Sequence, residues 1–178
     1  TSLRFLPLAD AIAIAYVMPF IMLLLGWLVL GEEVGPRRLI ACVFGFLGTL
    51  LVVQPSLANV GAPALLPLLV AVLFALFVLV TRGIAKEVDP MALQALGGMM
   101  ALPFLLLALL LGWWSGAPAL RLIPVGAGDA LLLAATGVLG TLAHLLMTWA
   151  LRYAPSATLA PMQYLEIPFA TLIGWVVF

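Results

Sequence analysis

The amino-acid sequence predicts an all-α membrane protein, a polytopic transmembrane helix bundle with an inverted-topology repeat. Hydrophobic residues make up 66% of the 178 residues and charged residues only 8%, which is far from the composition of a soluble domain. Apolar runs long enough to cross a bilayer recur from one end of the chain to the other. In addition, a stretch near the start returns near the end, which indicates an internal repeat.

Six membrane spans account for the apolar runs. The second span carries Ala41, Gly45 and Thr49, which are small residues at a spacing that lets helix backbones approach closely. The fourth ends at Trp113-Trp114, where an interfacial aromatic anchor is expected. Glycine and proline punctuate the segments between the spans. In order, the predicted spans cover residues 8–30, 39–53, 64–80, 91–111, 130–151 and 157–178.

The basic residues predict the orientation of the spans. The two on one side of the membrane are Arg4 and Arg121. The five on the other side, in the loops after the first, third and fifth spans, are Arg37, Arg38, Arg82, Lys86 and Arg152. Because loops rich in Lys and Arg stay in the cytoplasm, segments 31–38, 82–90 and 151–155 are expected to be cytoplasmic.

The repeat relates the first span to the sixth. Residues 3–7, Leu-Arg-Phe-Leu-Pro, return at residues 151–155 as Leu-Arg-Tyr-Ala-Pro, an offset of 148 positions. The same offset pairs Tyr16 with Tyr164 and Gly26 with Gly174. An odd number of crossings separates the first span from the sixth, so equivalent helices cross the membrane in opposite senses. Inverted repeats are typical of secondary transporters, whose sites lie near the midplane between the two halves.

The sixth span contains Glu166 near its centre. Nine Leu, Ile, Val or Phe residues in 157–178 contribute about −3 to −5 kcal/mol to insertion, against roughly +2.5 to +3.5 kcal/mol for one central charge. The span therefore tolerates the acid, and acids at that depth usually face a bundle interior or a watery cavity. Pro161 and Pro168 each remove a helical hydrogen bond nearby, so a loosened half-turn is expected beside the carboxylate.

Four further residues are candidates for contact with a solute. Gln163 lies one turn before Glu166 on the same face, but interhelical hydrogen bonding is an equal alternative. Tyr16 and Tyr164 are repeat equivalents, and either aromatic packing or a shared cavity explains them. His144 lies between Thr141 and Thr148. We interpret it as a structural histidine in preference to a proton relay.

The remaining marked residues are given structural interpretations. Asp10, near the outer end of the first span, is expected to cap a helix or meet lipid headgroups. Cys42 is expected to be a small buried hydrophobe. The charged loop residues that are expected to act as topological anchors at the membrane surface are Glu32, Glu33, Arg37 and Arg38. Since His and Cys each occur once, no metal site, disulfide or cofactor is predicted.

These motifs resemble the drug/metabolite transporter superfamily, EamA type. The first half carries Pro7-Leu8-Ala9-Asp10-Ala11, Gly31-Glu32, Arg37-Arg38 and Gly45-Phe46-Leu47-Gly48. The second half carries Ala154-Pro155-Ser156-Ala157, Leu165-Glu166-Ile167-Pro168-Phe169-Ala170 and Gly174-Trp175. The family more usually has proline directly after the glutamate, whereas here Ile167 intervenes. The resemblance is strongest over 3–54 and 151–178 and only compositional through 56–130.

The resemblance implies ten helices in two inverted halves, of which this chain would be a fragment containing helices four to nine. Residues 1–55 would end the first repeat and 56–178 would begin the second. The implied function is secondary transport of small metabolites or drugs across a bacterial inner membrane, with export the expected direction. In that reading Glu166 and Tyr16 line a central cavity, with Gln163, Tyr164 and His144 as weaker candidates.

The partners implied are a small-molecule solute and the lipid bilayer, with no nucleic acid, since seven basic residues balance seven acidic ones. Protons as the coupling ion and a second copy as a homodimer partner are left open. Two other classes also stay open. A polytopic enzyme acting on lipid-linked substrates needs several acids or histidines gathered at one membrane face, and the loops here are poor in both. A non-transporting assembly subunit would instead pack the Glu166 face dry against protein.

Overall fold

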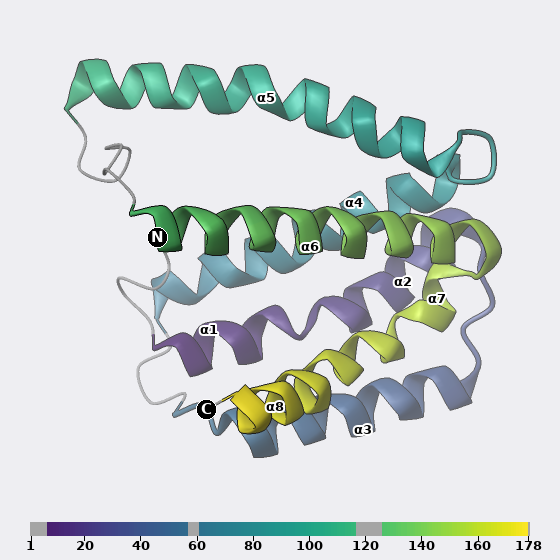
Figure 1. The fold of residues 1–178 in the computed structure, drawn as a ribbon. Helices are drawn as coiled ribbons and strands as arrows, with labels where there is room; N and C mark the ends of the chain where they lie inside the picture. Colours follow the sequence, from purple (N-terminus) through teal and green to yellow (C-terminus); the bar gives the residue numbers. More distant parts are fainter. Residues whose placement is uncertain (1–6, 57–60, 117–125, 178) are drawn as a thin grey trace. The chain divides into compact units, whose positions relative to one another are not determined.

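The computed structural model describes residues 7–56, 61–116 and 126–177, and these form helices joined by turns, without strands (Figure 1). The predicted all-α fold class is therefore confirmed. The chain divides into two compact units, residues 1–84 with 151–178, and residues 85–150. In order, the helices are α1 (Leu8–Ala15), α2 (Met18–Leu30), α3 (Pro36–Val53), η2 (Ala62–Ala64), α4 (Leu65–Ile84), α5 (Pro90–Ser115), α6 (Ala127–Tyr153), α7 (Ser156–Leu159), η4 (Pro161–Leu165) and α8 (Glu166–Val177).

The first five predicted spans are confirmed by helices of sufficient length and hydropathy, most of them longer than expected. Over the described residues these are Leu8–Leu30, Pro36–Val53, Ala62–Ile84, Pro90–Ser115 and Ala127–Tyr153. The sixth predicted span is not one continuous helix. It is divided into α7, the 3₁₀ segment η4 and α8, because Pro161 begins η4 and has no N–H with which to continue α7.

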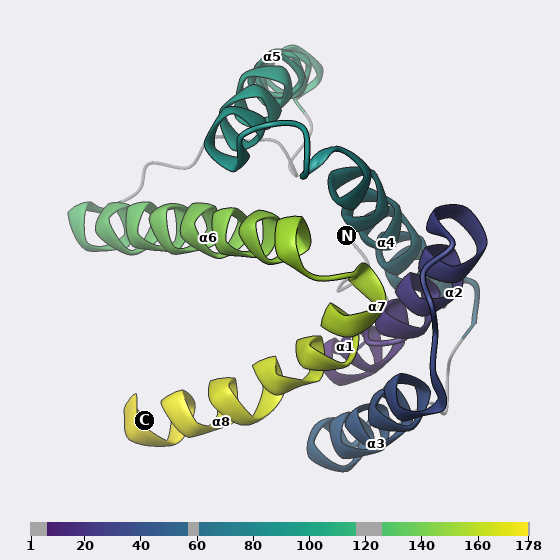
Figure 2. The same cartoon turned by 90° about the vertical axis from the view of Figure 1, so that its right-hand side faces the viewer.

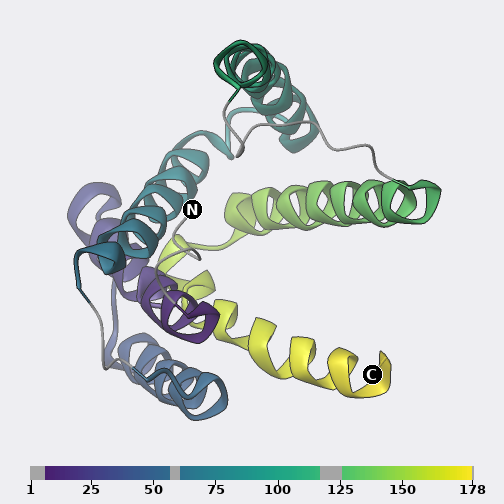
Figure 3. The ribbon, with the colours of Figure 1, turned by 90° about the vertical axis from the view of Figure 1, so that its left-hand side faces the viewer.

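In the first unit, α4 packs along α1 and α2, as Figure 3 shows. The face of α4 that makes these contacts carries small side chains. Ala71, Ala75 and Val78 are buried there, at intervals of four and three residues. Small side chains on this face allow the helix backbones to come close. On α2, Met22 and Leu23 are buried in the same core. Figure 2 shows α7 beside α2, and η4 packs against α3.

The first and sixth predicted spans are interrupted at equivalent positions. The helix that begins at Leu8 stops at Ala15 and resumes at Met18, while the segment that begins at Ser156 breaks and resumes as α8 at Glu166. Adding the sequence offset of 148 to the first pair of helix starts, 8 and 18, gives 156 and 166. The broken geometry thus follows the same register as the sequence repeat.

Pro168 lies in the first turn of α8, where a proline is tolerated. The loosened half-turn expected beside Glu166 is present as the 3₁₀ segment η4, which ends just before the acid. Pro19 likewise lies in the first turn of α2, one position earlier in the repeat, because the offset of 148 pairs it with Ile167.

Asp10 is buried in the first unit, with only 2% of its surface exposed. Its carboxylate accepts hydrogen bonds from the Ser56 backbone N–H at 2.7 Å and from the Ser56 hydroxyl at 3.1 Å. The expectation that Asp10 meets lipid headgroups was wrong, because this carboxylate holds the segment that follows α3. Cys42 is buried, as expected.

The second unit contains α5 and most of α6. The Asp89 carboxylate begins α5 by accepting hydrogen bonds from the backbone N–H groups of Met91 and Ala92, at 3.0 and 3.2 Å, which is the usual arrangement of an N-cap. Trp113 and Trp114 lie exposed at the end of α5, where the sequence predicts interfacial anchors. Both helices are long and mostly exposed in the chain alone.

Candidate functional site

The two tyrosines predicted to share a cavity lie against each other in the first unit. The rings of Tyr16 and Tyr164 are stacked, with centroids 5.9 Å apart and an interplanar angle of 26°. The Tyr164 hydroxyl donates a hydrogen bond of 2.9 Å to the Tyr16 backbone carbonyl. Since these residues are repeat equivalents, the sequence relation and the contact coincide at one point of the fold.

The break between α1 and α2 makes this hydrogen bond possible. In a continuous helix the Tyr16 carbonyl would accept from the Phe20 backbone N–H. Here that N–H donates to the Val17 carbonyl instead, at 3.0 Å. The Tyr16 carbonyl is therefore free to accept from the phenol of Tyr164. This hydrogen bond joins the two interrupted spans at a point where most of their side chains are apolar.

Gly45 on α3 makes room for the ring of Tyr164. A Cβ atom added to Gly45 would lie 2.6 Å from Tyr164 Cγ, well inside contact distance. Gln163, the neighbour of Tyr164, donates from its amide to the Met22 sulfur at 3.6 Å. We call Tyr16, Met22, Gly45, Gln163 and Tyr164 the tyrosine cluster.

Glu166 adjoins the tyrosine cluster. It is the first residue of α8 and is exposed in the chain. Its carboxylate is the charged group that interacts with the Tyr16 phenol. Four of the five candidate residues therefore meet in the first unit. The fifth, His144 on α6, belongs to the second unit; it is half-buried, and its carbonyl accepts from the Thr148 hydroxyl at 2.9 Å.

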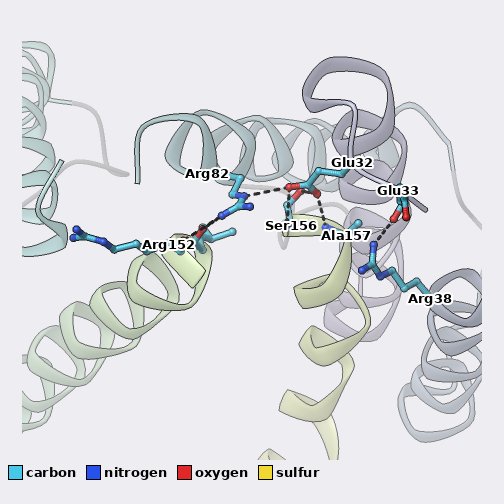
Figure 4. A network of polar contacts seen from close by, with 8 residues as sticks. Glu32, Glu33, Arg38, Arg82, Arg152, Ser156 and Ala157 are labelled. Carbon is cyan, nitrogen blue, oxygen red and sulfur yellow. Dashed lines mark hydrogen bonds and ion pairs between the residues drawn. The ribbon is translucent and has the colours of Figure 1, made fainter. Parts of the chain in front are cut away.

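A second polar site is centred on Glu32, just after α2 (Figure 4). One carboxylate oxygen accepts from the Ser156 hydroxyl at 2.7 Å and from the Ala157 backbone N–H at 2.9 Å. The other accepts from the Ser156 backbone N–H at 3.1 Å and pairs with Arg82 Nε at 3.2 Å. We call Glu32, Arg82, Ser156 and Ala157 the Glu32 network.

Arg82 connects this carboxylate to the end of α6. Its Nη1 donates to the Leu151 carbonyl and, at 3.4 Å, to the Arg152 carbonyl. These two carbonyls belong to the last turn of α6, where helical hydrogen-bond partners run out and a cation is favourable. The Arg82 guanidinium therefore caps the end of α6 and forms the ion pair with Glu32.

The expectation that Glu32 is a surface anchor was wrong. Its side chain is only 9% exposed, because Gly31, with φ of 64°, turns the chain back over the end of α2. That turn is held by the hydrogen bond from the Glu32 N–H to the Gly26 carbonyl, at 3.0 Å. The sequence signal for this turn was the Gly31-Glu32 pair at the end of the first span, since a left-handed glycine commonly ends a helix. Arg38, by contrast, donates a local hydrogen bond, to the Glu33 carbonyl.

The Glu32 network favours the ionised carboxylate. Burial raises the pKa of Glu32, but the hydrogen bonds from Ala157, Ser156 and Arg82 outweigh burial, so the pKa lies below its ordinary value of 4.5. The charged form is the one that all these donors require, since an ionised carboxylate is an acceptor only.

This shift predicts an acid-sensitive contribution to stability. A group whose pKa is lower in the folded state stabilises the fold above its unfolded pKa and loses that contribution as the pH falls through the folded pKa. The difference in melting temperature between the wild-type full-length protein and Glu32→Gln should therefore stay constant from about pH 7 to about pH 5 and shrink below about pH 4.5. Thermal unfolding in detergent across this range measures it.

Glu33→Gln is the matched control, because Glu33 is the neighbouring residue and is exposed. It should unfold like the wild type across the same range. A Glu32→Gln difference that is already vanishing near neutral pH would contradict a lowered pKa for this carboxylate.

Comparison with known proteins places the chain in a family. Residues 1–54 and 62–178 match the EamA-like transporter family. A riboflavin transporter of Rhizobium johnstonii is 34% identical over 99% of this chain and 56% of its own length. Riboflavin transporters of Brucella anthropi and Vibrio cholerae are 28% and 27% identical, over 61% and 55% of their lengths. No solved structure matches the chain.

The chain spans a little over half the length of these curated relatives. Its apolar helices make it a multi-pass membrane protein, and the family match extends over nearly all of the sequence. The resemblance read from the motifs is thus confirmed: the chain belongs to the EamA-like transporter family.

Proposed function

We propose that the full-length protein is a secondary transporter for a flat aromatic metabolite of the riboflavin class, and that the solute binds at the tyrosine cluster. The observation that carries the proposal is the stacked pair Tyr16 and Tyr164 at the point where two spans are interrupted. Three relatives named riboflavin transporters support the choice of solute.

The chemistry of the tyrosine cluster suits such a solute. Planar aromatic groups stack favourably on aromatic rings in offset arrangements, and Tyr16 and Tyr164 already hold two rings in that orientation. The Gln163 amide supplies both a donor and an acceptor for the polar edge of a heterocycle. Binding sites of small molecules commonly combine aromatic walls with a few polar groups of this kind.

The interrupted helices support a midplane location. Transporter sites are typically formed where discontinuous transmembrane helices leave backbone groups without a helical partner, and the Tyr16 carbonyl, which accepts from the Tyr164 hydroxyl, is one such group. In this proposal the two halves related by the offset of 148 place the cavity between them. Segments 31–38, 82–90 and 151–155 face the cytoplasm, export is the direction, and Glu166 is the site of proton coupling.

Transport by proteoliposomes that contain the full-length protein tests the proposal, with riboflavin as the solute on either side of the membrane. Tyr164→Leu should raise the half-saturating riboflavin concentration about fivefold to tenfold, since an aromatic pair contributes about 1 kcal/mol and about 1.4 kcal/mol is tenfold in affinity. Phe169→Leu is the matched control, because it removes an exposed ring from the same segment.

The direction of transport is given by comparing riboflavin movement when the solute is supplied only outside the proteoliposomes with its movement when it is supplied only inside. Absence of riboflavin movement in both directions would contradict the proposed solute. An equal effect of Tyr164→Leu and Phe169→Leu would remove the tyrosine cluster from the binding site. Unchanged pH dependence of transport in Glu166→Gln would remove the coupling role of Glu166.

A further inference from the structure

We propose that the Glu32 network is a latch, which ties the end of α2 to the start of α7 and must open in each transport cycle. The inference rests on transport by the full-length protein, but not on the identity of the solute. The Glu32 network is distinct from the tyrosine cluster, which is proposed to bind the solute.

The latch joins three chain segments through one carboxylate. Glu32 follows α2, Arg82 lies in the last turn of α4, and Ser156 and Ala157 begin α7. Three of the four contacts to the carboxylate come from Ser156 and Ala157, at 2.7 to 3.1 Å. The bond between Glu32 and α7 is therefore multiple and charge-assisted, which makes it stronger than neutral hydrogen bonds.

The backbone approach beneath the latch is close. A Cβ atom added to Gly26 would lie 3.0 Å from the Ser156 hydroxyl oxygen and 3.0 Å from a Glu32 carboxylate oxygen. Thus α2 lies close to the start of α7 at this point, and Gly26 leaves no side chain between them. Polar groups exchange protein partners for water when they separate, so such a contact can open without exposing a large apolar face.

The same two stretches of chain carry four of the five residues of the tyrosine cluster, all but Gly45. The stretch from Tyr16 to Glu32 includes α2, and the stretch from Ser156 to Tyr164 includes α7 and η4. They are held together at one end by the Tyr16–Tyr164 stack and at the other by Glu32. Because alternating access opens one side of a central site at a time, parting α2 from α7 at Glu32 opens a route to the tyrosine cluster from this end.

A reversible disulfide across the latch tests the proposal. Gly26→Cys with Ser156→Cys places the two sulfurs in reach of each other, since the added Cβ lies 3.0 Å from the present hydroxyl oxygen. The full-length protein also carries Cys42→Ala, so that no other thiol of residues 1–178 interferes. Oxidation should reduce solute movement at least about tenfold, and reductant should restore it, if opening is required at every cycle.

The single variants Gly26→Cys and Ser156→Cys are the controls, and the transport rate of each should be the same before and after oxidation. An oxidised pair that transports like its reduced form would overturn the latch. If the reduced pair is itself inactive, or if riboflavin is not the solute, accessibility of the tyrosine cluster decides the matter without transport.

For that measurement a cysteine replaces Gln163 in the full-length protein with Cys42→Ala, and a membrane-impermeant thiol reagent is added from each side. Opening the latch with Glu32→Gln should raise the labelling rate at position 163 at least about threefold, from the side of the 31–38 loop alone, because population of the open state rises. Glu33→Gln is the matched control. Equal labelling in Glu32→Gln and Glu33→Gln would show that Glu32 is a static contact and would overturn the proposal.

Discussion

Arg82→Met is expected to lower the free energy of unfolding of the full-length protein by about 2–3 kcal/mol, since it leaves a largely buried carboxylate without its cationic partner and two helix-end carbonyls without the arginine donor. The side chains of Arg82 and Glu32 are only 12% and 9% exposed, so water does not readily replace the lost contact. Methionine retains most of the apolar stem of arginine, and the change therefore isolates the guanidinium.

Arg37→Met is the matched control, because Arg37 is exposed in the 31–38 segment; it should change the free energy by less than about 0.5 kcal/mol. A double-mutant cycle with Glu32→Gln separates the ion pair from the bonds to the α6 carbonyls. We expect a coupling energy of about 1 kcal/mol or more between Arg82 and Glu32. Additive effects would mean that Arg82 stabilises the fold through the Leu151 and Arg152 carbonyls alone.

The parts of the fold that the sequence predicts are those encoded in short stretches. The apolar runs give five spans, because hydropathy and length are local properties. Proline predicts the interruption of the sixth span, since Pro161 lacks a backbone donor whatever its tertiary surroundings. The repeat also relates residues that are distant along the chain, because it pairs Tyr16 with Tyr164 across 148 positions. In the structure these two rings are stacked.

The Glu32 network escapes sequence reasoning because its partners are distant along the chain. Ser156 is 124 positions from Glu32, and Arg82 is 50 positions away. A glutamate and arginines in a short loop have the same local pattern whether they anchor topology or bind another helix. Asp10 presents the same ambiguity, since its partner Ser56 belongs to a segment after α3. Only tertiary packing decides between a solvated charge and a buried one.

The packing of Tyr164 against α3 leads to the second large effect, which concerns Gly45. Gly45→Ala is expected to destabilise the full-length protein by about 1–3 kcal/mol, as overpacked sites usually do, although alanine is the better helix former by about 1 kcal/mol. The reason is steric, because the new methyl group would lie 2.6 Å from Tyr164 Cγ. Relief requires the ring to move, and that movement separates it from Tyr16.

Gly48→Ala is the control that makes this result interpretable. Gly48 lies on the same helix, α3, one turn further on, and an added Cβ there meets nothing within 4 Å. Helix propensity changes equally in both variants, so Gly48→Ala should be neutral or slightly stabilising, and the difference between them measures the contact with Tyr164. Equal unfolding free energies would contradict close packing of α3 on η4. If Gly45→Ala also weakens solute binding while Gly48→Ala does not, the position of the Tyr164 ring, and not merely its presence, sets the affinity of the tyrosine cluster.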